Sequence, residues 1–163
     1  MIMEYCPCCG TKAEQKFVGG KGKMSYCNTC KKPLFSFSYS CILTLIIDEY
    51  RNFAFIQQYN IPCNTFIGIA GYLNHGETFE EAVRREVFEE VGLVANRIEY
   101  IRSYYYEQKD LLMVGFITEV NHAEFRLSIE ADNAKWFAPD EVKSILPENS
   151  ITSKLFMDYI SRI

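Results

Sequence analysis

The stretch GYLNHGETFEEAVRREVFEEVGL, residues 71–93, carries the clearest structural signal in this chain. Its apolar residues recur every four positions, at Val83, Val87 and Val91. That period is typical of a helix with one face on the core. Thr78 is a favourable N-cap, and Glu81 three residues later completes a capping box. Gly92 stands where helices commonly end in a left-handed residue. The pattern predicts a helix over residues 78–91.

Three acidic side chains lie beside this valine stripe, namely Glu86, Glu89 and Glu90. Spacings of three and four place their carboxylates on one helical face, where like charges repel. A tight group of carboxylate oxygens is, however, a ligand set that Mg²⁺ or Mn²⁺ prefers. A solvated acidic helix face is the ordinary alternative, and the three residues alone leave both interpretations open.

The wider pattern resembles the signature of the Nudix hydrolases, G-x5-E-x7-R-E-U-x-E-E-x-G-U, in which U is aliphatic. Every fixed position of that signature is met, at Gly71, Glu77, Arg85, Glu86, Val87, Glu89, Glu90, Gly92 and Leu93. The resemblance implies a loop–helix–loop that holds divalent metal against a diphosphate. It makes Glu86, Glu89 and Glu90 metal ligands, together with the backbone carbonyl of Gly71.

The same resemblance gives Arg85 the role of orienting a glutamate within the catalytic group. Glu81 lies one turn earlier on the helix, so we expect it to pair with Arg85. Glu77 is expected to brace the preceding loop against Arg85. The general base stays open between Glu86, Glu89 and a residue outside the motif, because this role differs among family members. His75 occupies a variable position and is expected to be an exposed loop residue.

The first thirty residues contain four cysteines in two C-x2-C pairs separated by 17 residues: Cys6, Cys9, Cys27 and Cys30. This spacing is typical of a structural zinc site, which would supply the folding energy of so small a segment. Disulfides are the alternative, and Cys8 could compete with Cys9 for the ion. Cys41 and Cys63 lie in apolar stretches and are expected to be inert core thiols.

The net charge of −4 is unevenly distributed. Residues 1–35 hold six lysines and two acidic residues, so the rest of the chain carries −8. No apolar run approaches the roughly 20 residues of a membrane-spanning helix. No basic region followed by an apolar stretch opens the chain, which disfavours a secretory signal. We therefore expect a cytoplasmic protein without a membrane partner. Nucleic-acid binding by the lysine-rich segment is weakly supported.

The remaining segments alternate between strand and helix patterns. Strands are expected over residues 35–47, 53–59, 65–70, 97–108, 111–120 and 135–137, and helices over residues 139–146 and 151–163. This order predicts an α/β (α+β) domain. Together with the Nudix resemblance it implies a mixed sheet between helices over residues 35–163, preceded by a zinc ribbon over residues 1–34.

A four-cysteine ribbon ahead of a Nudix domain resembles the NADH pyrophosphatases, a group that also removes NAD caps from RNA. That group carries an SQPWPFPxSLM array, of which this chain keeps only Ser103 and the pair Leu112-Met113 in register. Glu130 stands six residues before Trp136-Phe137 and matches the group's extra metal-binding glutamate. The fold and metal site are implied by this resemblance, whereas NADH specificity is not. A homodimer, common in the group, is left open.

Three tyrosines replace the missing array. Tyr104 and Tyr106 share one face of the expected strand, where they would offer a stacking platform for a base. The alternative is that aromatic residues simply favour strands and half-buried surfaces.

These observations predict a Mg²⁺- or Mn²⁺-dependent pyrophosphohydrolase with Glu86, Glu89 and Arg85 in catalytic roles. Its substrate would be a nucleoside diphosphate linked to another moiety, such as NAD(H). The alternatives are a nucleotide-sanitising or ADP-sugar hydrolase, and a non-catalytic sensor of nucleotides or RNA.

Overall fold

The computed structural model describes residues 3–59, 62, 65–129 and 131–163. The chain divides into two compact units, Met1–Ser38 and Tyr39–Ile163. The expected boundary after residue 34 falls four residues before this division. Each unit has its own sheet, and none of the helices in the described part of the chain is long and apolar enough to cross a bilayer.

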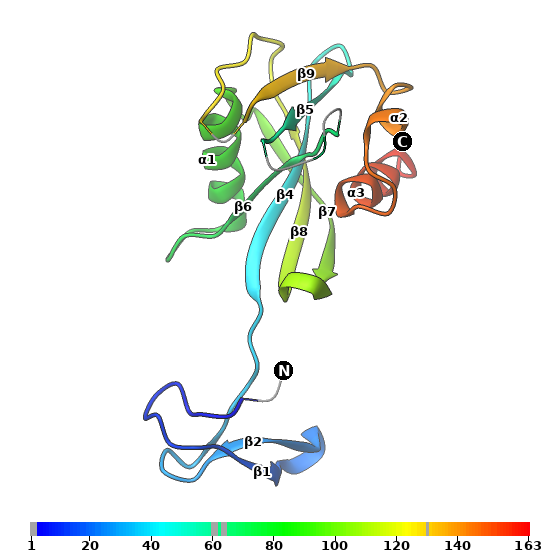
Figure 1. Ribbon diagram of the computed structural model, residues 1–163. Coiled ribbons are helices and arrows are strands. Elements are labelled where there is room, and N and C mark those ends of the chain that lie inside the picture. Colours follow the sequence, from blue (N-terminus) through cyan, green and yellow to red (C-terminus); the bar gives the residue numbers. More distant parts are fainter. Residues whose placement is uncertain (1–2, 60–61, 63–64, 130) are drawn as a thin grey trace. The chain divides into compact units, whose positions relative to one another are not determined.

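The first unit is an antiparallel sheet with a very small core. Its described strands, in spatial order, are β1 (Glu14–Phe17), β2 (Lys23–Cys27) and β3 (Lys32–Pro33). A 3-10 turn, Gly19–Lys21, joins β1 to β2. Figure 1 shows this hairpin in blue. The buried core consists of Cys6, Cys27 and Leu34. So little apolar burial contributes only a few kcal/mol to stability, and a bound metal would have to add the rest.

The second unit is built on one mixed sheet. Its described strands are β4 (Tyr39–Ile47), β5 (Phe53–Gln57), β6 (Ile69–Tyr72), β7 (Arg97–Tyr106), β8 (Leu111–Glu119) and β9 (Asn133–Phe137). The order is β7-β8-β4-β5-β9, and β6 pairs with the first half of β4. The β4–β8 pair is parallel, whereas the other pairs are antiparallel.

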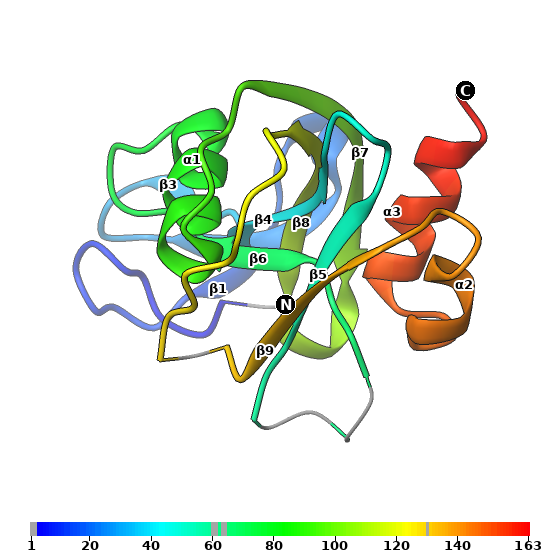
Figure 2. The same ribbon diagram turned by 90° about the horizontal axis from the view of Figure 1, so that it is seen from above.

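Helices cover both faces of this sheet, as Figures 1 and 2 show. Helix α1 (Phe79–Val91) lies on one face, and α2 (Val142–Ile145) and α3 (Ile151–Ile160) lie on the other. Side chains alternate along β4, so Leu43 packs toward the α3 core and Ile42 toward the α1 core. The predicted mixed sheet between helices is confirmed.

Several element boundaries differ from those that the sequence predicts. The strand expected from residue 35 begins at Tyr39, because residues 35–38 belong to the first unit. The strand expected over residues 65–70 is reduced to a bridge at Ile67 followed by β6. The helix expected over residues 151–163 ends at Ile160, and Leu155, Phe156 and Tyr159 of this helix lie in the core.

Candidate active site

Helix α1 begins and ends as its sequence predicts. The Oγ1 atom of Thr78 accepts a hydrogen bond from the Glu81 backbone N–H at 3.3 Å, and the Glu81 carboxylate accepts from the Thr78 N–H at 2.8 Å. Gly92 ends the helix with φ 71°, a left-handed conformation that favours glycine. The valine stripe is fully buried against the sheet. This anchoring leaves Glu86 and Glu89 on a face of α1 outside the valine stripe, whereas Glu90 is buried.

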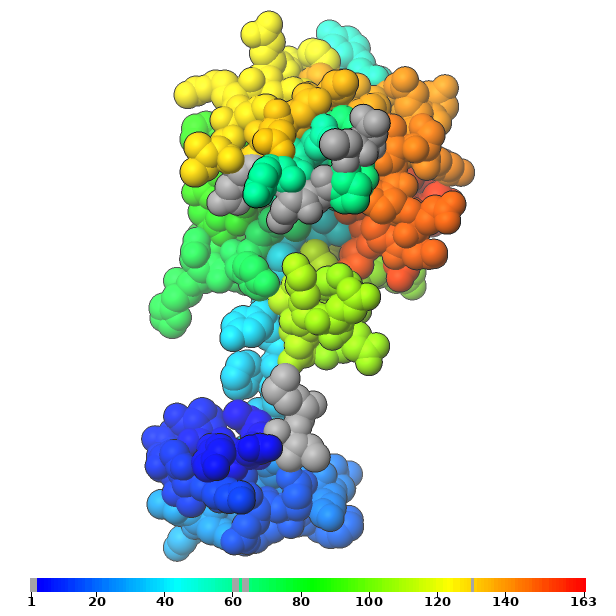
Figure 3. All heavy atoms as spheres, viewed as in Figure 1, coloured from blue at the N-terminus to red at the C-terminus, as the bar shows by residue number. Residues whose placement is uncertain are grey.

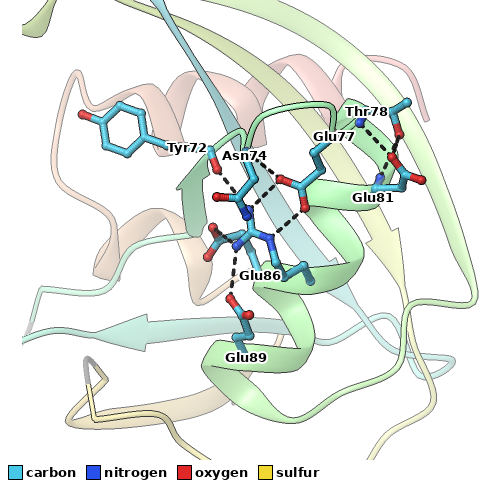
Figure 4. Close-up of polar contacts among 8 residues, drawn as sticks. Tyr72, Asn74, Glu77, Thr78, Glu81, Glu86 and Glu89 are labelled. Atoms are coloured by element: carbon cyan, nitrogen blue, oxygen red, sulfur yellow. Dashed lines mark hydrogen bonds and ion pairs between the residues drawn. The ribbon is translucent and has the colours of Figure 1, made fainter.

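The guanidinium of Arg85 is the centre of the polar network on that face. Figure 4 labels its partners Tyr72, Glu77, Glu86 and Glu89. Its Nε and Nη2 atoms donate to the two oxygens of Glu77, at 2.7 and 2.9 Å. Nη1 donates to Glu86 at 2.6 Å and to Glu89 at 3.1 Å. Nη2 also donates to the Tyr72 carbonyl at 3.0 Å. All five N–H donors of the guanidinium are therefore used, which fixes two motif glutamates relative to the loop.

The expected pairing of Arg85 with Glu81 is wrong. The Glu81 carboxylate is held by Thr78 in the capping box, which lowers the pKa of Glu81. Glu77 takes the place beside Arg85, so its predicted bracing role is confirmed. The hydrogen bonds from Arg85 and from the Asn74 N–H lower the pKa of Glu77 to about 2. The same contacts with Glu77 raise the pKa of Arg85.

Gly71 lies so close to Glu86 that a side chain at position 71 would displace the Glu86 carboxylate. A Cβ built on Gly71 would stand 1.8 Å from Oε1 of Glu86 and 2.0 Å from its Cδ. An alanine at position 71 would fit only if the flexible Glu86 side chain moved away, and strand β6 brings the Glu86 carboxylate against the backbone. Burial raises the pKa of Glu86, although Arg85 favours its charged form. The Glu86 carboxylate therefore lies against the backbone at Gly71, and carboxylate oxygens are ligands that a hard cation prefers.

The two remaining motif carboxylates differ in exposure. The Glu89 side chain is 56% exposed, whereas Glu90 is buried, with 5% of its surface accessible. Within the part of the chain that the structure describes, the only group of three or more ligand atoms within 4.8 Å of one another is the cysteine group of the first unit. In the α1 group, the guanidinium of Arg85 lies between the carboxylates of Glu86 and Glu89. The carboxylate donors fit a divalent ion chemically, and their role as ligands stays a prediction.

The C-terminal end of α1 is tied to the segment of residues 121–128. The N–H groups of Arg126 and Ser128 donate to the carbonyls of Val91 and Glu90, at 2.9 and 3.1 Å. Gly92 permits this approach, because a Cβ there would stand 2.7 Å from the Cβ of Arg126. The predicted ligand Glu130 lies outside the described residues. These contacts of residues 126 and 128 could not be predicted from the sequence, because backbone N–H donors leave no pattern in the residue types.

A buried carboxylate anchors the same segment from the other side. Asp48 accepts from the ring nitrogen Nδ1 of His122 at 2.6 Å and from the N–H groups of Tyr50 and Asn52. The His122 ring stacks on Trp136, with ring centroids 4.8 Å apart. Burial opposes the ionisation of Asp48, but these hydrogen bonds outweigh it and lower its pKa. The anchor holds the segment that meets the end of α1.

A cavity of about 610 Å³ opens beside β6 on the α3 face of the sheet. Ala70, the residue before Gly71, lines it, together with Tyr106, Met113 and the first residues of α3. In Figure 3 the yellow-green connection between β7 and β8 and the orange-red α3 are neighbouring surfaces of this unit. The cavity thus adjoins strand β6 on the sheet face opposite to α1, and it is large enough for a nucleoside.

The two tyrosines expected to bind substrate have different surroundings. Tyr106 lines this cavity, and its hydroxyl donates to Gln108 at 2.8 Å. Tyr104 packs against the core and donates to Asp158 of α3 at 2.7 Å. Burial and the Asp158 carboxylate raise the pKa of the Tyr104 hydroxyl. Substrate binding by either residue stays a prediction. His75 is exposed, as its loop position predicts.

The four predicted zinc ligands meet in the first unit. All four Sγ atoms lie within 4.8 Å of one another, with Cys6–Cys30 at 3.9 Å and Cys9–Cys27 at 3.5 Å. A tetrahedral site with Zn–S bonds of about 2.3 Å requires sulfurs about 3.8 Å apart, so the arrangement fits. The cysteines are free thiols rather than disulfides. Hydrogen bonds to Thr11 lower the pKa of Cys9 to about 6.

The other cysteines lie outside this group. Cys8 is exposed and accepts a hydrogen bond from the Lys32 ammonium at 3.0 Å, so it does not replace Cys9. Cys41 is buried, and burial raises its pKa to about 11, as expected for an unreactive thiol. Cys63 lies outside the described residues.

Comparison with known proteins agrees with the signature. The NUDIX domain family matches residues 40–159. The chain belongs to the Nudix family. It is 28% identical over 163 residues to the NAD-capped RNA hydrolase NudC of Vibrio parahaemolyticus, covering 99% of this chain and 61% of that protein. It is 39% identical over 89 residues to NudC of Actinobacillus succinogenes, covering 53% of this chain and 34% of the relative. The chain thus spans about 60% or less of these relatives.

Solved structures show the same fold. A NUDIX hydrolase from Nitrosomonas europaea matches with a TM-score of 0.65 at 18% identity, over 98% of this chain and 89% of that one. The NUDIX domain of Shewanella oneidensis NrtR, crystallised with ADP ribose, matches with a TM-score of 0.67 at 15% identity, over 84% and 93%. Nudix hydrolases use divalent metals, and the predicted resemblance to Nudix hydrolases is confirmed by the family match and the NudC relatives, while the four cysteines lie close enough together to hold a metal ion.

Proposed function

We propose that this chain is a Mg²⁺- or Mn²⁺-dependent pyrophosphohydrolase that cleaves a nucleoside diphosphate linked to another moiety. Its metal ligands would be the carboxylates of Glu86, Glu89 and Glu90, the Gly71 carbonyl and Glu130. The observation that supports this most is the contact between Gly71 and Glu86, where a single Cβ would overlap the carboxylate. Arg85 also holds the Glu86 carboxylate in this position, and a cation bound by Glu86 and the Gly71 carbonyl would need the same close approach.

Each residue of the site has a separate role in the proposed reaction. Bound divalent ions would neutralise the diphosphate and lower the pKa of a coordinated water. Arg85 holds Glu86 and Glu89 in one orientation, and Glu77 holds Arg85. Such fixed geometry accelerates a reaction because the catalytic groups need no reorganisation. Glu89 is the most exposed of the group and can accept a proton from water, although Glu86 or a residue outside the motif remains an alternative base.

NAD-type compounds are the substrate class that the relatives favour, because both NudC proteins carry the name NAD-capped RNA hydrolase. The cavity beside Ala70 and Tyr106 would accommodate the nucleoside, with Tyr106 beside the base. A nucleotide-sanitising or ADP-sugar hydrolase is the second candidate. It is favoured by the likeness in fold to the NrtR domain whose structure contains ADP ribose.

The ribbon, over residues 1–34, would hold one structural Zn²⁺ through Cys6, Cys9, Cys27 and Cys30. Residues 35–163 would form the catalytic domain. A tetrathiolate site suits zinc in preference to Mg²⁺, which prefers oxygen ligands. Assembly as a homodimer stays a prediction.

The function is tested by comparing Glu89→Gln with Glu80→Gln, a change of the same kind on an exposed position of α1. Turnover of NADH, ADP-ribose, diadenosine polyphosphates and dNTPs is measured with Mg²⁺ and with Mn²⁺. We expect Glu89→Gln to lower turnover by at least about a hundredfold, because it removes an anionic oxygen ligand. Glu80→Gln should leave turnover unchanged.

Full activity of Glu89→Gln would contradict the metal-site assignment. Tight nucleotide binding by the wild-type protein, without hydrolysis of any compound in the panel, would favour the sensor alternative.

A further inference from the structure

Two hollows of the second unit meet at the first turn of α3. The cavity beside β6, which is proposed to hold the nucleoside, is lined at this turn by Asn149 and Lys154. A second hollow, of about 540 Å³, is lined by the same two residues and by residues of β7 and α3, among them Arg102, Ser103 and Ser153. We call it the α3 hollow. Because Asn149 and Lys154 border both hollows, a substituent on a nucleoside in the cavity can extend into the α3 hollow.

The α3 hollow carries an excess of positive charge. Its ionised side chains are the cations Arg102 and Lys154 and the anion Asp158. Both oxygens of Asp158 already have donors, because one accepts from Nη1 of Arg102 at 2.9 Å and the other from the Tyr104 hydroxyl at 2.7 Å. The contact with Asp158 uses one of the five N–H donors of the Arg102 guanidinium, and that group makes no other hydrogen bond within the described residues.

The Lys154 ammonium is the second cation of the α3 hollow. Lys154 lies in the first turn of α3, where its backbone N–H donates to the Ser150 carbonyl at 3.0 Å. In the part of the chain that the structure describes, its ammonium takes part in no hydrogen bond or ion pair. The hydroxyl groups of Ser103 and Ser153 likewise have no partner among these residues. The hollow therefore contains an ammonium, two hydroxyls and part of a guanidinium that no internal contact engages.

The acidic side chains distinguish the two hollows. Glu107 and Glu148 line the nucleoside cavity and do not line the α3 hollow. They repel an anionic group inside the cavity, whereas Arg102 and Lys154 attract one into the α3 hollow. The N-terminal end of α3 adds partial positive charge there. A neutral base and sugar therefore suit the cavity, and an anionic group attached to them suits the α3 hollow.

A phosphomonoester is the anion that fits this set of donors. It carries between about 1.5 and 2 negative charges at neutral pH, and it has three oxygens that accept hydrogen bonds strongly. It can therefore accept from ammonium, guanidinium and hydroxyl groups at the same time. In a nucleoside diphosphate, the ribose 2′- and 3′-hydroxyls are the positions at which such a phosphate can be attached outside the diphosphate.

We propose that Lys154 and Arg102, with the hydroxyls of Ser103 and Ser153, bind a phosphate on the ribose of the substrate. This inference rests on the proposed function, and it narrows the substrate class to dinucleotides whose nucleoside carries a 2′- or 3′-phosphomonoester. Lys154 determines the preference for these compounds, because it borders both the nucleoside cavity and the α3 hollow.

The experiment compares substrates that differ only in this phosphate. The values of kcat and KM are measured with Mn²⁺ for NADPH against NADH, which tests a 2′-phosphate, and for coenzyme A against dephospho-coenzyme A, which tests a 3′-phosphate. The proteins are wild type, Lys154→Gln, Lys154→Arg and the control Lys143→Gln. Lys143 is an exposed lysine of α2 that lines neither hollow. Circular dichroism verifies that each variant is folded.

A hydrogen bond to a charged group changes an affinity about tenfold or more. We therefore expect wild type to prefer the phosphorylated member of one pair by at least about tenfold in kcat/KM. Lys154→Gln should remove most of this preference and leave the rate for the unphosphorylated member unchanged, whereas Lys154→Arg and Lys143→Gln should keep it. The preference should also shrink as the KCl concentration rises, because salt screens exposed charges.

Equal kcat/KM within both pairs, or a preference that Lys154→Gln leaves intact, would overturn the proposal. An equal loss of activity toward both members of a pair in Lys154→Gln would also overturn it, since Lys154 would then not act through the phosphate.

Binding without catalysis separates this inference from the proposed function. Isothermal titration calorimetry in the absence of Mg²⁺ and Mn²⁺ compares adenosine 2′,5′-bisphosphate and adenosine 3′,5′-bisphosphate with AMP. Tighter binding of a bisphosphate that is lost in Lys154→Gln supports the ribose-phosphate site; if no dinucleotide is hydrolysed, the hydrolase assignment alone fails. Normal NADH hydrolysis with equal binding of the three nucleotides would overturn the ribose-phosphate site and leave the proposed function intact.

Discussion

Replacing Gly71 by alanine tests the contact on which the proposed active site depends. The new Cβ would stand 1.8 Å from Oε1 of Glu86, although real Cβ atoms approach other heavy atoms to no less than about 3.0 Å. The carboxylate must therefore retreat by more than about 1 Å. A displacement of 1 Å at a catalytic group can lower the rate about a hundredfold. We expect kcat of Gly71→Ala to fall by about that factor.

The assay measures kcat and KM for NADH at several Mn²⁺ concentrations, together with thermal unfolding. The Glu86 side chain can swing away, so Tm should change by only a few degrees. Gly20→Ala is the control, because a Cβ at Gly20 would meet no heavy atom within 4 Å and the φ of Gly20 is one that alanine tolerates. A Gly71→Ala protein with wild-type kcat at all metal concentrations would refute the reasoning.

Three further predictions concern other parts of the chain. Removing zinc with a strong chelator should unfold the first unit and leave the second unit folded. Proton NMR would distinguish the two units, and unchanged signals from the first unit would contradict this prediction. Because folding lowers the pKa of Asp48, the ionised carboxylate contributes its full stabilisation at pH values above the ordinary pKa of 3.8. This contribution is lost as the pH falls below that value. Tm should therefore drop less between neutral and acid pH in Asp48→Asn than in wild type, and parallel curves would exclude the effect. Tyr104→Phe should lose about 1 kcal/mol of stability through its Asp158 hydrogen bond while NADH turnover is kept, and a large loss of turnover would give Tyr104 a direct role.

The local features of the motif could be predicted from sequence. The helix, its capping box and its glycine end depend on residues within one or two turns of each other, so the pattern of residues 78–92 specifies them. The cysteine spacing likewise predicts four sulfurs at one point, because each C-x2-C turn directs two thiols to the same side.

The partners of Arg85 could not be chosen from helical spacing alone. Glu81 is one turn away, but its carboxylate bonds Thr78, while Glu77 reaches Arg85 from the loop. The anchor of Asp48, His122 and Trp136 joins residues more than seventy positions apart, so no local pattern contains it. The start of β4 at Tyr39 could not be predicted either. The aromatic and β-branched composition extends across both units, so only the strand pairing within the sheet defines where β4 begins.

The most direct test of the account is anomalous diffraction from crystals of the protein soaked with Mn²⁺ and a non-hydrolysable dinucleotide diphosphate. We predict manganese peaks within about 2.5 Å of carboxylate oxygens of Glu86, Glu89 or Glu90, with the diphosphate bound to the same ions. Manganese bound elsewhere, with these carboxylates held only by Arg85 while the diphosphate is present, would contradict it.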